Sequence, residues 1–322
     1  MASVGLAFAV SLIWGALGVR LGSRWGFVDQ PGVDELKTHE RPAVPLGGVG
    51  VFLGVHAAAL LRSDWDWYLF AATSALVLLG LIDDRIGLSP RTRLAVELPA
   101  AIVIVIGASS AGSGLIQAIL GVLLVVLAIN AVNLLDGLDG LAGSAGLVSA
   151  VGLAFMATAR DMSGAGAAAL AATLLAFLIF NWHPARLFLG DSGAYVTGAL
   201  LAHHAIEVSP SNPLRLVVAG SLLGVFAVDL IVTVIRRSRA GRPLFAGDRS
   251  HVYDQMRDRG LSIRRVAVLV ALGQAALVAM IVLVDELSAA PVATVGVVVA
   301  FVASVVGLAI GGFLGARSPE PG

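Results

Sequence analysis

The stretch GLIQAILGVLLVVLAINAVNLLDGLDG, residues 114–140, decides the class of fold. Residues 114–132 carry no charged side chain and have the length, about 20 mostly apolar residues, that a helix needs to cross a bilayer. Residues 133–140 then bring an amide, two carboxylates and two glycines in quick succession. The first part predicts a transmembrane helix, and the second part predicts a polar loop at the membrane surface.

Further stretches of the same apolar character lie on both sides, at residues 3–20, 44–61, 66–82, 94–110, 141–158, 164–181, 187–206, 214–235, 265–284 and 290–315. Of the 322 residues, 58% are hydrophobic and 13% are charged, whereas about a quarter of a soluble domain is charged. The mean hydropathy is +0.92. Long apolar runs favour helices over a barrel, whose strands alternate. We therefore predict an all-α, polytopic integral membrane bundle of about eleven (10–11) transmembrane helices, forming one domain over residues 1–322.

The distribution of basic residues predicts the orientation of the bundle. With the N-terminus outside and the C-terminus in the cytoplasm, 18 of the 21 Lys and Arg residues lie in or beside cytoplasmic segments, all except Arg62, Arg160 and Arg215. Cytoplasmic loops carry an excess of Lys and Arg, so this orientation is favoured. The chemically interesting side chains concentrate on the same loops, residues 21–43, 83–93, 133–140, 182–191 and 236–264. We expect the active site there.

Two of these loops carry carboxylates close together. Asp83 and Asp84 end the third apolar stretch, and adjacent carboxylates repel each other unless a cation such as Mg²⁺ lies between them. A solvated helix end explains this pair equally well. Asn133, Asp136 and Asp139 are spaced by three residues, so a helical turn would present them on one side. The alternative for this loop is an ordinary Asn/Asp/Gly turn between helices.

A third loop and the basic side chains complete the set. Asp191 enters an apolar stretch, where a charge is costly unless it is paired or bound to a metal. Arg and His side chains suit phosphate, although a positive-inside anchor explains most of the arginines and leaves the single His251 unexplained. Carboxylates and cations gathered on one membrane face are what metal-assisted phosphoryl chemistry needs. The basic candidates are Lys37, His39, Arg242, Arg249 and His251.

Other polar residues are expected to be structural. We interpret His203-His204, near the outer side, as an interfacial pair. Asp229 is seven residues from Arg236 on the same predicted helix, so we expect these two side chains to pair. A role for His183, before a proline, as a capping or interfacial residue is as well supported as a functional role.

Five segments, in this order, resemble the motifs of the polyprenyl-phosphate N-acetylhexosamine-1-phosphate transferase family: HERPAVPLGGVG (39–50), LIDDRIGLSPRTRL (81–94), NAVNLLDGLDGLA (130–142), FNWHPARLFLGDSG (180–193) and RPLFAGDRSH (242–251). The resemblance implies transfer of an N-acetylhexosamine 1-phosphate from a UDP-sugar to undecaprenyl or decaprenyl phosphate. The products would be UMP and a polyprenyl-diphosphate sugar, in the first membrane step of making a cell-envelope glycan.

The resemblance also implies roles for single residues, with Mg²⁺ as the cofactor and Mn²⁺ as an alternative. It implies catalytic roles for Asp83, Asp84, Asp136 and His251, and metal binding by Asp84 and Asp191. It implies substrate binding by Lys37, His39, Arg93, Asn133, Asp139, Arg242 and Arg249. The expected partners are a UDP-N-acetylhexosamine, polyprenyl phosphate and the bilayer of the plasma membrane. Nucleic acid is not expected at zero net charge, and a homodimer is left open.

One departure from the family pattern bears on the substrate. The family has a His-rich run after the position of His251, whereas this chain continues Val252-Tyr253-Asp254. The departure weighs against the muramoyl-pentapeptide branch, so UDP-N-acetylglucosamine is the expected donor. A transporter or lipid flippase is the alternative function. Such proteins place ionisable groups at mid-membrane in broken helices, whereas here the acidic groups gather at the inner helix ends.

Overall fold

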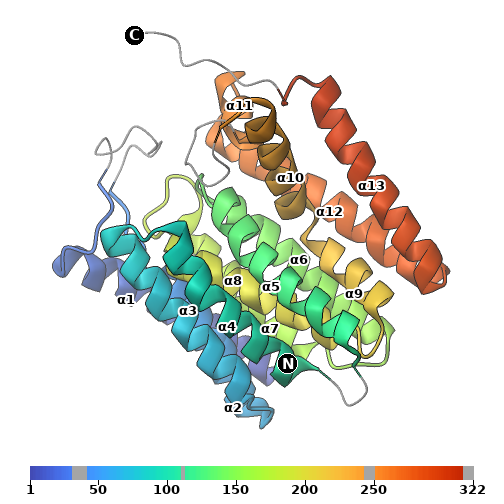
Figure 1. The fold of residues 1–322 in the computed structure, drawn as a ribbon. Helices are drawn as coiled ribbons and strands as arrows, with labels where there is room; N and C mark the ends of the chain where they lie inside the picture. Colours follow the sequence, from blue (N-terminus) through green and yellow to red (C-terminus); the bar gives the residue numbers. More distant parts are fainter. Residues whose placement is uncertain (31–41, 110–112, 243–250, 315–322) are drawn as a thin grey trace.

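The computed structural model describes residues 1–30, 42–109, 113–242 and 251–314 (Figure 1). In these ranges the chain is helical, and its extended pairings are two isolated bridges, Asp29 with Ala43 and Val44 with Leu187. The helices are α1 (Ala2–Arg24), α2 (Gly47–Arg62), α3 (Trp67–Ile86), α4 (Pro90–Ala108), α5 (Leu115–Leu135), α6 (Leu141–Ala159), α7 (Ala165–Asn181), α8 (Gly190–Glu207), α9 (Pro213–Gly220), the 3₁₀ turn η1 (Ser221–Leu223), α10 (Gly224–Arg239), α11 (Val252–Asp258), α12 (Ile263–Leu287) and α13 (Ala290–Ile310).

The predicted all-α character is confirmed for the described residues, and every predicted apolar stretch coincides with helix. The structure adds two details to these predictions. The ninth stretch, predicted at residues 214–235, lies within one candidate span, Pro213–Arg239, in which the 3₁₀ turn η1 separates α9 from α10. The predicted loop 236–264 contains an additional short helix, α11.

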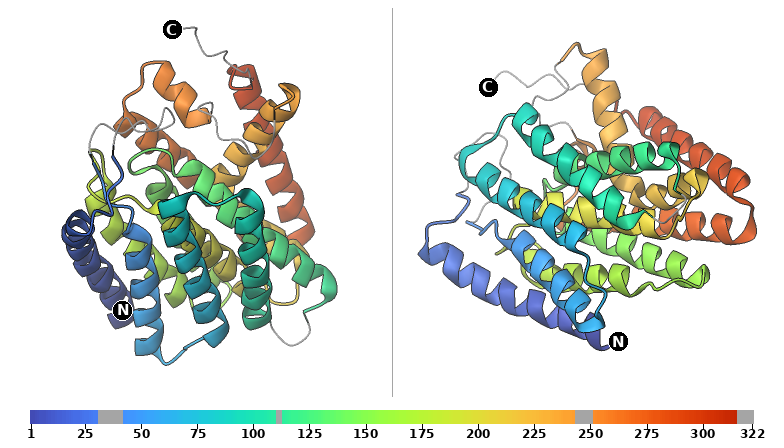
Figure 2. Two further views of the ribbon diagram at one scale, coloured as in Figure 1. Left: turned by 60° about the vertical axis from the view of Figure 1, so that its left-hand side comes forward. Right: turned by 60° about the horizontal axis from the view of Figure 1, so that its bottom comes forward.

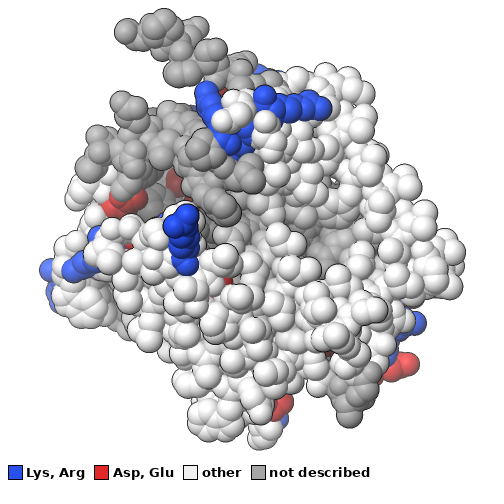
Figure 3. Space-filling view, in the orientation of Figure 1, with Lys and Arg blue, Asp and Glu red and all other residues white. Residues whose placement is uncertain are grey.

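The surface of the bundle is that of a membrane protein. The helices long and apolar enough to cross a bilayer are α1, α5, α6, the α9–α10 segment, α12 and α13, while α2 and α7 are apolar but shorter. On α13, large side chains such as Val295, Val299 and Val302 are exposed, as lipid contact requires. On the face in Figure 3, charged side chains lie mainly toward the two ends, and the broad middle is uncharged. The count of eleven spans stays a prediction.

The positions at which several helices begin follow from their capping residues. The Asp66 carboxylate accepts hydrogen bonds from the N–H groups of Tyr68 and Leu69 and so caps α3. The Ser89 hydroxyl caps α4, where Pro90 occupies the first turn, and Ser262 caps α12. These side chains satisfy backbone donors that have no partner inside the helix.

Helix α8 lies at the centre of the bundle. Its residues from Ser192 to Ile206 are buried without interruption, and it packs against α2, α3 and α5 (Figures 1 and 2). The left view of Figure 2 shows α1 beginning at the lower end of the bundle and α13 ending at the upper end. The first turn of this central helix carries Asp191.

A buried glutamine supports the break between α9 and α10. Gln274 of α12 accepts a hydrogen bond from the Val225 N–H at 2.8 Å and donates to the Leu222 carbonyl at 2.6 Å. It also donates to the Ser149 hydroxyl of α6 at 2.8 Å. Backbone groups freed by a break are costly away from water unless they find a partner. Gln274 supplies that partner and joins the break to two neighbouring helices.

Candidate active site

A cavity of about 250 Å³ opens where the ends of α3 and α5 meet the start of α8. Acidic side chains are the most frequent kind in its lining, and two amides accompany them. The acidic residues are Asp29, Asp84, Asp136, Asp139 and Asp191, and the amides are Asn133 and Asn181. The structure therefore brings together four predicted carboxylates from three separate motifs. It adds Asp29, from the segment after α1, which the motifs did not predict.

Close backbone contacts fix Asp191 in this cavity. A side chain on Gly80 of α3 would lie 2.1 Å from the backbone nitrogen of Ser192, so only glycine permits this approach. Gly48 of α2 makes a similar contact with Gly193. Gly190, which precedes Asp191, has a φ of +71°, a conformation that glycine adopts readily. These glycines thus allow the start of α8 to pack closely against α2 and α3.

Asp84 is poised to bind a cation. Its Oδ1 accepts a hydrogen bond from the Asp191 N–H at 2.9 Å, at the positive end of α8. Its Oδ2 is buried and has no hydrogen-bond partner. A buried carboxylate oxygen without a donor calls for an ion or water, and Mg²⁺ takes oxygen ligands. Asp84, with Asp191 beside it on the same cavity, therefore fits the predicted magnesium site.

Asp83 has different surroundings from its neighbour and does not line the cavity. Its Oδ1 accepts hydrogen bonds from the Leu88 N–H at 2.6 Å and from Arg93 Nη2 at 3.0 Å. Its Oδ2 accepts one from the Tyr195 hydroxyl at 2.5 Å and pairs with Arg93 Nε at 2.5 Å. Both oxygens are engaged, so Asp83 holds Arg93 in place rather than offering a free carboxylate.

The loop after α5 contributes the other acidic wall. Asn133 lies next to the Asp191 carboxylate, and Asp136 lines the cavity just beyond the end of α5. Burial raises the pKa of Asp136 well above its usual value, and the neighbouring charges of Asp191, Asp84 and Asp139 raise it further. Mutual repulsion of this kind is relieved when a cation enters the cavity.

Asp139 braces the segment between α7 and α8. Its Oδ2 accepts a hydrogen bond from the Ala185 N–H at 3.0 Å and lies 2.7 Å from His183 Nδ1. Asn181 adds a second brace, because its side chain accepts from the Gly140 N–H and donates to the Leu187 carbonyl. The rim of the cavity is therefore tied to the loop after α5, and His183 has a partner that its sequence position did not reveal.

His251 is buried outside the cavity. Its Nδ1 lies 2.8 Å from Asp229 Oδ2, and its ring stacks on Tyr253 with centroids 5.2 Å apart. The Tyr253 hydroxyl donates to the Leu134 carbonyl at 3.3 Å, and the ring packs on Gly137. Asp229 thus binds His251, where Arg236 was the expected partner. The structure places His251 in the packing of α11 against the loop after α5.

Arg93 and Arg242, the other predicted basic residues in the described part of the chain, do not line the cavity. Arg93 pairs with Asp83, and Arg242 is exposed just after α10. Lys37, His39 and Arg249 lie outside the described residues. Their predicted contacts with phosphate stay predictions.

Comparison with known proteins identifies the family. The sequence profile described as glycosyl transferase family 4 matches residues 67–209, which include the five predicted aspartates. The decaprenyl-phosphate N-acetylglucosaminephosphotransferase of Mycolicibacterium smegmatis is 31% identical over 99% of this chain and 91% of that protein. The protein of the same name from Mycobacterium tuberculosis H37Rv is 30% identical, over 84% of this chain and 79% of that protein.

A relative from Bacillus subtilis has a similar degree of identity. The probable undecaprenyl-phosphate N-acetylglucosaminyl 1-phosphate transferase of Bacillus subtilis is 29% identical over 84% of this chain and 81% of that protein. These matches extend over most of both chains. The chain therefore belongs to glycosyl transferase family 4, among the polyprenyl-phosphate N-acetylhexosamine-1-phosphate transferases that its motifs resemble.

Proposed function

We propose that this protein transfers N-acetylglucosamine 1-phosphate from UDP-N-acetylglucosamine to a polyprenyl phosphate, releasing UMP. The relatives that match most of the chain are named for N-acetylglucosamine phosphotransfer onto decaprenyl phosphate or undecaprenyl phosphate. The observation that carries the proposal is a carboxylate-lined cavity at one end of an apolar helical bundle. A lipid phosphate confined to the membrane surface and a nucleotide sugar from water can meet there.

The reaction is a displacement at phosphorus. An oxygen of the polyprenyl phosphate attacks the phosphorus that carries the sugar and forms a new P–O bond. The bond from that phosphorus to the bridging oxygen of the diphosphate breaks, and UMP leaves with that oxygen. Both reactants are anions, so positive charge near the diphosphate is needed to stabilise the transition state.

We propose that Asp84 and Asp191 hold Mg²⁺, with Mn²⁺ as an alternative. The unpartnered Oδ2 of Asp84 and the position of both carboxylates on the cavity support this assignment. When bound, the ion neutralises charge on the diphosphate and orients its oxygens. Asp136 lies near both carboxylates, and a bound cation would favour its ionised form.

Of the remaining residues, some are proposed to contact the substrates and others to position the residues that do. Asn133 and Asp136 are proposed to contact the nucleotide sugar, and Asp139 to shape its site through His183 and Ala185. Asp83 is proposed to position Arg93 for phosphate, and His251 to position the loop after α5 through Tyr253. Phosphate contacts are also proposed for Lys37, His39, Arg242 and Arg249.

We propose that the cavity faces the cytoplasm, in a plasma-membrane protein of eleven spans with its N-terminus outside. The bias of Lys and Arg toward the loops at the cavity end supports this orientation. UDP-sugars are cytoplasmic metabolites, so the donor would reach the cavity directly from that side.

A donor panel tests the proposed function. Purified protein is incubated with polyprenyl phosphate, Mg²⁺ and, in turn, UDP-N-acetylglucosamine, UDP-N-acetylgalactosamine, UDP-glucose and UDP-N-acetylmuramoyl-pentapeptide, and UMP is measured. We expect the fastest lipid-dependent UMP release with UDP-N-acetylglucosamine. Faster release with the muramoyl-pentapeptide donor would assign the protein to the other branch. If none of the four donors gave lipid-dependent UMP release, the proposed chemistry would be contradicted.

A further inference from the structure

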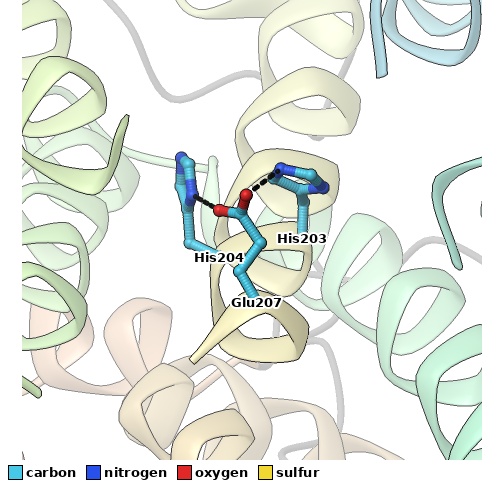
Figure 4. A group of neighbouring side chains, drawn as sticks. All are labelled: His203, His204 and Glu207. Carbon is cyan, nitrogen blue, oxygen red and sulfur yellow. Dashed lines mark hydrogen bonds and ion pairs between the residues drawn. The ribbon is translucent and has the colours of Figure 1, made fainter. Parts of the chain in front are cut away.

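A second cluster of metal-ligand side chains lies at the far end of α8. His203 and Glu207 are four residues apart and His204 and Glu207 three apart, so all three project from one side of the helix. Figure 4 shows the Glu207 carboxylate between the two imidazole rings, with each ring directed toward it. The helix rise of about 1.5 Å per residue places this cluster about 18 Å along α8 from Asp191. It is therefore separate from the cavity.

The donor atoms lie close together and are reached from one side. His204 Nδ1 lies 2.7 Å from Glu207 Oε2, and His203 Nε2 lies 3.4 Å from Glu207 Oε1. All three ligand atoms are within 4.8 Å of one another. Ligands of a tetrahedral ion with bonds of about 2.0–2.1 Å are about 3.3 Å apart, so modest rotations would close the site. Both rings are buried, whereas the Glu207 side chain is 46% exposed and open to entry of an ion.

Hydrogen bonding leaves this cluster incompletely satisfied. Each ring turns one nitrogen toward Glu207, and the opposite nitrogens, His203 Nδ1 and His204 Nε2, are buried without a hydrogen-bond partner. The Glu207 carboxylate has no Lys or Arg partner among the described residues. Nearby Arg62 is already paired with Asp64 at 2.7 Å. A bound cation would place positive charge directly against this carboxylate.

We propose that His203, His204 and Glu207 bind a Zn²⁺ ion at the end of α8 opposite the cavity. Two imidazole nitrogens and one carboxylate suit zinc and related transition metals, whereas Mg²⁺ and Ca²⁺ prefer oxygen ligands throughout. Three protein ligands leave a fourth position for water at the exposed side of Glu207. The bound ion fixes the last turn of α8 and the two buried rings.

Cobalt spectroscopy of the full-length protein tests the proposal. The protein carries an affinity tag without histidine, is treated with EDTA, and is titrated with Co²⁺ in detergent, followed by Zn²⁺. The chain has no cysteine, so no thiolate site contributes to the spectrum. We expect visible absorption of tetrahedral Co²⁺ that saturates at about one ion per chain and is displaced by Zn²⁺. The same signal is expected in Asp191→Asn, which separates it from metal in the cavity.

Matched variants locate the site. Glu207→Gln keeps the size of the side chain, and we expect it to weaken Co²⁺ and Zn²⁺ binding at least about tenfold. Mutating even a residue that only supports a metal ligand lowers metal affinity by that much. His203→Ala is expected to do the same. His251→Gln is the control, because His251 is a buried histidine that pairs with Asp229 and lies outside the cluster. Unchanged thermal unfolding in EDTA shows that a variant is folded. Equal binding by wild type and Glu207→Gln, or no tetrahedral signal in the wild type, would overturn the proposal.

Discussion

Asp83 and Asp84 are neighbours in the chain, but their side chains leave α3 in different directions. Successive residues of a helix are turned by about 100°, so one side chain faces the cavity and the other faces Arg93 and Tyr195. The sequence predicts that both carboxylates belong to the site. It does not predict their separate surroundings, because Tyr195 lies in an apolar stretch and gives no signal that its hydroxyl is directed at Asp83.

The two aspartates should therefore respond differently to magnesium. We predict that Asp84→Asn raises the Mg²⁺ concentration needed for half-maximal rate at least about tenfold, because it removes a metal ligand. Asp83→Asn should lower kcat but leave that Mg²⁺ concentration near the wild-type value, because Asp83 acts through Arg93. The measurement is the initial rate of UMP release against Mg²⁺ concentration. A larger shift for Asp83→Asn than for Asp84→Asn would reverse the assignment.

Asp136 offers a test by stability. Its pKa is raised in the folded protein, so its ionised form costs stability, and this cost grows as the pH rises above the usual carboxyl range. We predict that Asp136→Asn raises the unfolding temperature in EDTA, more at pH 8 than at pH 5, while abolishing most transfer activity. Asp161→Asn, at an exposed position, is the matched control and should change neither. Equal unfolding temperatures at pH 8 for Asp136→Asn and wild type would contradict the repulsion described here.

At the scale of the elements, the apolar stretches predicted where the helices lie, because apolar length is a local property of the sequence. The break in the ninth stretch was missed, although Gly220-Ser221 and Gly224 were visible signals for it. The docking of α11 was also missed, since His251, Asp229 and Tyr253 are brought together by tertiary packing alone. Asp29 was also not predicted, because its place on the cavity follows from tertiary folding and not from a motif in the sequence around it.

Gln274 should be critical for the broken helix. We predict that Gln274→Leu lowers the unfolding temperature by several degrees, because it leaves the Val225 N–H and the Leu222 carbonyl buried without partners. Gln274→Glu keeps an acceptor for the Val225 N–H but loses the amide N–H groups that donate to Leu222 and Ser149. It therefore shows whether those donated hydrogen bonds matter. The control is Leu272→Ala on an exposed part of α12, which should change the unfolding temperature little. A Gln274→Leu variant as stable as wild type would show that other groups support the break.

At the scale of the whole molecule, the claim is that the cavity end of the bundle faces the cytoplasm. The chain has no cysteine, so single cysteines can be labelled without background. We predict that a cysteine at Asp161, in the connection between α6 and α7, reacts with an impermeant reagent in intact cells. A cysteine at Ser238, near the end of α10, should react only after the membrane is opened. The opposite labelling pattern would show that the bundle has the inverse orientation in the membrane.

The central claim is that the sugar and its phosphate move together to the lipid. The most direct measurement uses UDP-N-acetylglucosamine with ¹⁴C in the sugar and ³²P at the phosphate attached to it, incubated with the purified protein, polyprenyl phosphate and Mg²⁺. The account predicts that both labels enter the lipid fraction in equal molar amounts and that unlabelled UMP is released. Carbon label in the lipid without phosphorus label, with UDP as the product, would show transfer of the sugar alone and contradict the account.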